Sequence, residues 1–184
     1  MLKRLPSLGL AALLTVILTA SAAWAVSPET IDRRVQNALT EFYGKVNGGE
    51  DLVKKAAGIL VFPKVGKGGI GIGFEYGQGA LLVDGKTVDY YSTKAASIGF
   101  QLGGQVRKQI ILFMNPEALQ KFRLSDGWEV GIDGSVALVT VGAGGAIDTT
   151  EANEPVIGFI FSNKGLMYNL SFEGSKITKL NKKN

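Results

Sequence analysis

The chain has 184 residues and a formal net charge of +4, and it contains neither histidine nor cysteine. Their absence excludes disulfides and thiol nucleophiles, and it removes the commonest general base and the usual zinc and copper ligands. The charge is too small to indicate nucleic-acid binding by itself. We therefore predict a protein that is not an enzyme, with no cofactor, no metal and no nucleic-acid partner.

The N-terminus has the three-part plan of a secretory signal peptide. Lys3 and Arg4 precede an apolar run over residues 8–23, and residues 23–25, Ala-Trp-Ala, have the pattern of a cleavage site. A retained membrane anchor is the alternative, although the run is shorter than the roughly 20 apolar residues of a spanning helix. We predict that residues 1–25 are cleaved and that residues 26–184 form one exported, periplasmic domain.

Two helices are predicted next. Ser27-Pro28-Glu29 combines a capping hydroxyl, a proline at the first helical position and an acid in the first turn. The apolar residues that follow form a single stripe at helical spacing: Ile31, Val35, Ala38, Leu39 and Phe42. This stripe either docks on the core or enters a membrane interface. After a glycine break, residues 50–57 predict a shorter helix.

The periodicity changes from helix to strand at Gly58. Residues 59–62 predict a buried strand, residues 66–69 a turn, and residues 70–76 a strand of strict alternation. The alternation puts Ile70, Ile72, Phe74 and Tyr76 on one face and Gly71, Gly73 and Glu75 on the other. If Glu75 lies inside a barrel, its carboxylate needs a partner.

The rest of the chain predicts further hairpins and one short helix. Asp84-Gly85 is a strong hairpin turn, and strands over 95–106 and 109–114 are expected to turn near Arg107-Lys108. A helix near 116–124 has Asn115 as its cap and three apolar residues to bury, Leu119, Phe122 and Leu124.

Residues 128–141 predict one strand, or two broken by Gly134, and residues 156–161 and 166–172 predict a hairpin. The basic tail from Gly174 is expected to fray at its end. An apolar-Gly-apolar tripeptide recurs, centred on Gly73, Gly99, Gly131 and Gly158. Since glycine inside a strand permits bends and close backbone contacts, we predict an α+β fold whose antiparallel sheet is strongly curved or barrel-like, with the N-terminal helices packed on it.

Two motifs that could carry chemistry are weak. The glycines over residues 66–79 could form a nucleotide-binding loop, but a strand follows them where a helix would be required. Asp126, Glu129 and Asp133 form the densest carboxylate cluster, yet they lack the glycine-interleaved spacing of a calcium loop. We interpret these acids as solvated loop and strand charges.

Basic residues gather around the first strand and the helices before it: Arg33, Arg34, Lys54, Lys55, Lys64 and Lys67. Each basic residue near an anionic membrane is worth about 1 kcal/mol, so such a cluster suffices for reversible lipid binding. An ordinary solvated face is the alternative, and composition alone favours that alternative.

The chain contains several longer motifs: residues 58–64 (GILVFPK), the glycine-rich residues 68–79, Tyr90-Tyr91-Ser92, residues 125–131 (SDGWEVG) and residues 162–168 (SNKGLMY). Together these motifs resemble the SYLF family of lipid-binding domains, in its exported bacterial branch. The resemblance implies N-terminal helices over a barrel-like sheet and phospholipid binding in place of catalysis. It places the contact with anionic head groups on the six basic residues named above.

The leading hypothesis is therefore a monomeric, periplasmic protein that binds the anionic phospholipid surface of a membrane peripherally. The alternative is an envelope protein-interaction or assembly factor that uses exposed sheet edges or the loop over residues 142–154. A hydrolase that uses serine or carboxylates is the third and least favoured hypothesis, because no nucleophile-elbow pattern is present.

Overall fold

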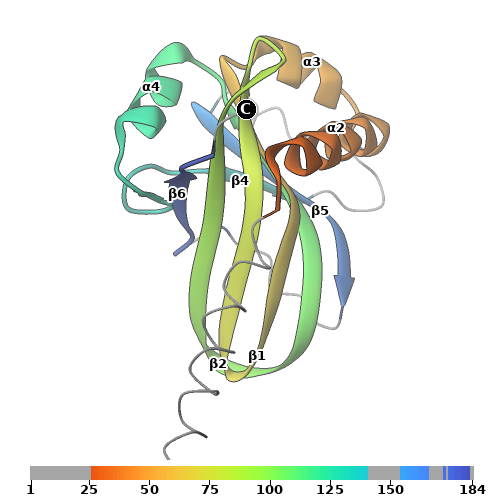
Figure 1. The fold of residues 1–184 in the computed structure, drawn as a ribbon, viewed down its shortest axis with the longest axis vertical. Helices are drawn as coiled ribbons and strands as arrows, with labels where there is room; N and C mark the ends of the chain where they lie inside the picture. Colours follow the sequence, from red (N-terminus) through yellow and green to blue (C-terminus); the bar gives the residue numbers. More distant parts are fainter. Residues whose placement is uncertain (1–25, 141–153, 166–171, 173, 183–184) are drawn as a thin grey trace, which may run out of the picture.

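The computed structural model describes residues 26–140, 154–165, 172 and 174–182. The predicted signal peptide, most of the loop over residues 142–154 and nearly all of the predicted strand 166–172 lie outside these residues. The fold is α+β: an open, strongly curled sheet carries helices at one end, which confirms the predicted class (Figure 1). The helices are α2 (Pro28–Lys45), α3 (Gly49–Lys55) and α4 (Pro116–Leu124). The strands are β1 (Gly58–Val83), β2 (Lys86–Phe113), β3 (Trp128–Glu129), β4 (Ala137–Thr140), β5 (Val156–Gly165) and β6 (Lys176–Leu180).

β1 and β2 form one long antiparallel hairpin. Its turn is the predicted Asp84-Gly85, where both residues have positive φ angles of 50° and 72°, the conformation that a two-residue hairpin loop requires. The register runs from Val83 opposite Lys86 to Gly58 opposite Phe113. The predicted turns at residues 66–69 and at Arg107-Lys108 are wrong, because strand pairing continues through both places.

The hairpin instead folds back on itself as a whole, near the register shift between Ile70 and Ile72 (Figure 1). The second half of β1 then lies against the first half with almost no space between the backbones. A Cβ atom on Gly79 would lie 2.0 Å from the Val61 carbonyl oxygen, and one on Gly77 would lie 2.9 Å from that of Lys64. These glycines therefore permit the close approach that curls the sheet, as predicted.

Two apolar clusters hold the helices on the two faces of the sheet. The predicted stripe of α2 is buried against β1, β2 and β5, with the Phe42 ring edge-on to Phe159 at 4.9 Å. The Asn115 side chain caps α4 by accepting from the Ala118 N–H at 2.8 Å, and Phe122 of this helix stacks on Phe113. Leu124 is 78% exposed, so its predicted burial is wrong; it is the last residue of the helix and faces away from the sheet.

A buried ion pair lies inside the curl. Arg107 Nη2 donates to both Glu75 carboxylate oxygens, at 2.7 and 2.8 Å, and Gln109 Nε2 donates to one of them at 3.1 Å. The two charged side chains are 1% and 3% exposed. Glu75 thus has the partner that its inward position requires, and the partner comes from the other strand of the folded hairpin.

The C-terminal part contains a strand that was not predicted and a glycine that lies outside its predicted strand. Residues 176–180 form β6, which pairs with Tyr90–Lys94 of β2 and with β3; the fraying predicted for the end of the tail falls on residues that include 183–184, outside the described ones. Gly131 has a φ of 93° and lies in a turn between β3 and β4, so its tripeptide is not within a strand. β4 runs parallel to β5, whereas the other strand pairs are antiparallel, as predicted.

Candidate functional site

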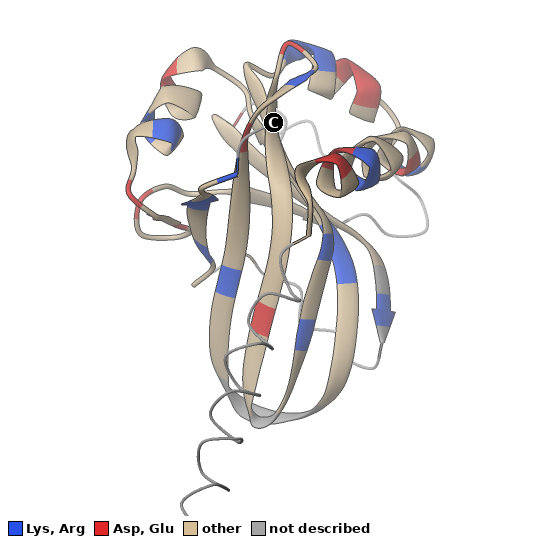
Figure 2. Cartoon of the chain, viewed as in Figure 1, with Lys and Arg blue, Asp and Glu red and all other residues tan. Residues whose placement is uncertain are grey.

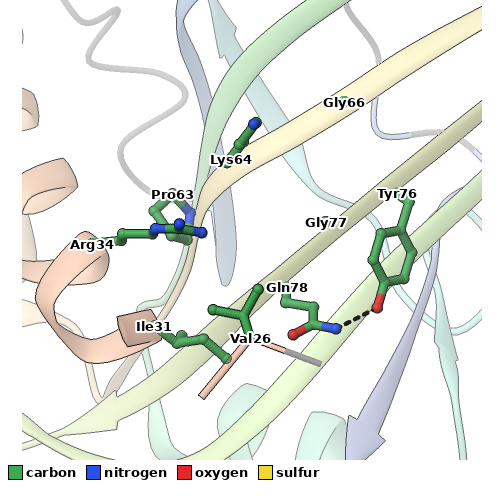
Figure 3. Close-up of a pocket in the computed structure, with 9 residues that line it drawn as sticks. All are labelled: Val26, Ile31, Arg34, Pro63, Lys64, Gly66, Tyr76, Gly77 and Gln78. Atoms are coloured by element: carbon green, nitrogen blue, oxygen red, sulfur yellow. Dashed lines mark hydrogen bonds between the residues drawn. The ribbon is translucent and has the colours of Figure 1, made fainter. Parts of the chain in front are cut away.

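A pocket of about 340 Å³ opens where the N-terminal half of α2 meets the folded strand β1 (Figure 3). The fold-back creates it, because residues of the two halves of β1 become neighbours. Its lining residues are Val26, Ile31 and Arg34 from the α2 side, and Pro63, Lys64, Gly66, Tyr76, Gly77 and Gln78 from β1.

The pocket presents two cations beside apolar walls. Arg34 and Lys64 are both exposed, and neither forms an ion pair with any residue in the described part of the chain. Figure 3 shows Arg34 reaching from α2 alongside Pro63, with Lys64 next to it on the strand. Val26, Ile31 and Pro63 supply the apolar side.

Neutral hydrogen-bonding groups complete the lining. Gln78 Nε2 donates to the Tyr76 hydroxyl at 2.5 Å (Figure 3). Gln78 Oε1 has no hydrogen-bond partner among the residues described, and the Tyr76 hydroxyl keeps its own proton to donate. The arrangement suits a ligand that joins an anionic group, such as a phosphate, to an apolar part.

The structure separates the six predicted lipid-binding residues. Arg34 and Lys64 share the pocket, whereas Arg33 is exposed on α2 outside it and Lys67 follows on β1. Lys54 forms an i,i+4 pair with Glu50 at 2.9 Å and lines a different pocket, at the junction of α2, α3 and the Asp84-Gly85 turn; Lys55 is exposed at the end of α3.

Sequence reasoning missed Tyr76 and Gln78. The alternation that put Tyr76 on the apolar face of its strand is correct, but that face is turned to solvent near the fold-back. Ile72, Phe74 and Tyr76 are 51%, 65% and 40% exposed, while Gly73 and Glu75 are buried. The available signal was residue size: small glycines alternate with large apolar residues, and since glycine permits close approach where β1 packs against itself, the large residues lie on the outer face.

The carboxylate cluster has a structural contact. Asp133 accepts a hydrogen bond from the Glu129 N–H at 2.6 Å and so closes the turn after β3.

Within the described ranges, no group of three or more acidic residues is placed to hold a metal ion. Among the helices described, none is both long enough and apolar enough to cross a membrane.

A family model for Ysc84, described as "Las17-binding protein actin regulator", matches residues 94–184. No curated protein matches the chain. The matched residues run from the middle of β2 to the C-terminus, whereas the pocket residues come from α2 and β1, before the match begins.

Proposed function

We propose that this chain, which belongs to the Ysc84 (SYLF) family by the match of the family model to residues 94–184, is a non-enzymatic phospholipid-binding protein. The family is one of binding domains associated with lipids and actin regulators. We further propose that this chain contacts anionic head groups through Arg34 and Lys64, with Tyr76 and Gln78 as hydrogen-bonding neighbours.

One observation carries the proposal: the fold brings two cations without acidic partners in the described residues to one pocket with apolar walls. A phosphodiester needs an opposite charge and hydrogen-bond donors, and its acyl region needs apolar surface. Two basic residues near an anionic surface contribute about 2 kcal/mol together, enough for weak, reversible binding.

We also propose that the protein acts in the bacterial periplasm. The support is the signal-peptide pattern of residues 1–25, with cleavage after Ala25. The membrane would then be the inner leaflet of the outer membrane or the outer leaflet of the inner one. N-terminal sequencing of protein recovered from the periplasm tests this, and an N-terminus other than Val26 contradicts the cleavage site.

The test of lipid binding is co-sedimentation with phosphatidylglycerol vesicles and, separately, with phosphatidylcholine vesicles. We expect binding to the anionic vesicles at low salt that weakens at high salt. Arg34→Gln with Lys64→Gln should lower the apparent affinity roughly 30-fold, the equivalent of about 2 kcal/mol.

The matched control is Lys54→Gln with Lys55→Gln, which removes the same charge outside the pocket. Equal losses from both double variants would show a diffuse basic surface and would overturn the pocket as the binding site. Equal binding to anionic and neutral vesicles would overturn the head-group mechanism altogether.

A second candidate is protein binding, as an interaction or assembly factor of the cell envelope. The family description itself names a protein ligand, and Ile132 is 75% exposed at the turn after β3. A defined partner recovered from envelope extract by the parent protein, and lost with Ile132→Ser, would favour this function if vesicle binding were absent.

A further inference from the structure

We propose that the folded end of the β1–β2 hairpin is a membrane-inserting edge. In this proposal, which rests on the function above, the apolar side chains of Ile72, Phe74 and Tyr76 enter the interfacial layer of an anionic bilayer. We call these three residues the outer stripe.

The outer stripe inverts the ordinary pattern of a soluble strand. Its apolar side chains point to solvent, and the acid between them, Glu75, points inward to Arg107. The strand opposite does not cover the stripe, because Phe74 pairs with Ala96 and Tyr76 with Lys94, and both partners are exposed. Figure 1 shows the helices at the other end of the sheet, away from the fold-back. A single exposed apolar residue needs no explanation, but adjacent large ones on one face mark an interaction surface.

The surrounding charge selects an anionic occupant. In the register, Lys94 is opposite Tyr76 and Lys67 is opposite Gln105, while Lys64 lines the pocket that Tyr76 also lines. None of these lysines forms an ion pair with a described residue. The carboxylate of Glu75 is neutralised by Arg107, and Figure 2 shows more blue (Lys, Arg) than red (Asp, Glu) along the long strands. Apolar side chains with lysines beside them suit a lipid interface, where the lysine stems extend and their ammonium groups reach the head groups.

The stripe is continuous with the pocket. Tyr76 belongs to both, so a head group held by Arg34 and Lys64 would direct its acyl region along Phe74 and Ile72. From Ile72 to Tyr76 the strand rises four steps, about 13 Å at roughly 3.3 Å each, which is well short of the roughly 30 Å hydrocarbon core of a bilayer, so the stripe suits shallow insertion and not spanning. A tyrosine at the pocket end fits the boundary between apolar and wet regions.

The chain has no cysteine, so a single introduced cysteine can carry an environment-sensitive fluorophore such as nitrobenzoxadiazole. We would label Phe74→Cys and, as a control, Leu124→Cys, which is exposed on α4 at the helical end. All proteins keep the same N-terminus, so any contribution of residues 1–25 is common to both. With phosphatidylglycerol vesicles, we expect a several-fold emission increase with a blue shift at position 74 and no change at position 124.

A second pair of variants measures the contribution of the ring. Phe74→Ser should weaken vesicle binding about tenfold, since partial burial of a phenylalanine side chain is lost, whereas Phe74→Leu should bind nearly as well as the parent. The site is exposed, so both variants should keep the parent's urea unfolding midpoint.

The outcomes separate this inference from the proposed function. Vesicle binding with an unchanged signal at position 74 overturns insertion and leaves head-group binding intact. Loss of all vesicle binding in the parent protein overturns both. A signal change at position 74 that needs no vesicles and grows with protein concentration identifies a second copy of the chain as the occupant, and it also overturns insertion.

Discussion

Breaking the Glu75–Arg107 pair should destabilise the protein far more than breaking an exposed pair. Both side chains are nearly inaccessible, and Glu75 accepts three hydrogen bonds at 2.7, 2.8 and 3.1 Å. Arg107→Met leaves a buried carboxylate with only Gln109, and Glu75→Leu leaves a buried guanidinium. Each variant should lose about 3–5 kcal/mol of unfolding free energy, because an uncompensated charge remains in the curl.

The double variant Glu75→Leu with Arg107→Met should be much less damaged than either single variant. It removes both charges together and leaves the Gln109 amide without its carboxylate acceptor, which costs about 1–3 kcal/mol. Urea unfolding of the four proteins gives the coupling energy as a double-mutant cycle. Lys54→Met is the control: its pair with Glu50 has 65% and 59% exposed side chains, so we expect a change within about 0.5 kcal/mol. A loss below about 1 kcal/mol for Arg107→Met, or simple additivity in the cycle, would refute the assignment of a buried, coupled pair.

Three further predictions follow from the packing and the charges. Gly79→Ala should lower the unfolding free energy by at least about 3 kcal/mol or prevent folding, because its Cβ would lie 2.0 Å from the Val61 carbonyl oxygen. Gly66→Ala is the control and should be nearly neutral, because a Cβ there has nothing within 4 Å. Equal thermal midpoints for the two variants would contradict the close approach at Gly79. Hydrogen bonds from Lys108 and Ser162 lower the pKa of Glu41 from 4.5 to about 2, so its ionised form stabilises the fold above pH 4.5 and this contribution is lost as the pH falls toward 2. Glu41→Gln should flatten the urea midpoint across that window relative to the parent, and parallel pH profiles would count against it. Removing residues 176–184 should expose Trp128, which β6 helps to cover, and should shift its fluorescence to the red; an unchanged spectrum would show that β6 is dispensable.

The helices could be predicted because their signals are local. Ser27 and Asn115 cap their helices as expected, accepting from Thr30 and Ala118 at 3.4 and 2.8 Å, and helical periodicity identified the buried stripe of α2. The Asp84-Gly85 turn was equally local, since its residues tolerate positive φ.

The fold-back could not be located in the same way. The chain stays in strand conformation through the bend, with only a register shift between Ile70 and Ile72, so no turn sequence marks the bend. Arg107-Lys108 resembled a turn because two charges interrupt an apolar run, but Arg107 is the partner of Glu75, 32 residues earlier. No local pattern links such residues.

The candidate site shows the same limit. Alternation separated the two faces of residues 70–76, yet it does not say which face is turned to solvent. That depends on β1 packing against itself, a contact between residues such as Val61 and Gly79. The basic residues were visible in the sequence, but only the folded chain shows that Arg34 and Lys64 share a pocket while Lys54 does not.

The long hairpin also bears on where this family's unit can be cut. The family match begins at Lys94, within β2, and so omits all of β1. It also omits residues 90–93 of β2, which pair with β6. A fragment of residues 94–184 would leave its longest strand with an unpaired edge and its apolar face without α2. We therefore expect the smallest piece that folds on its own to begin upstream of the matched residues, at α2.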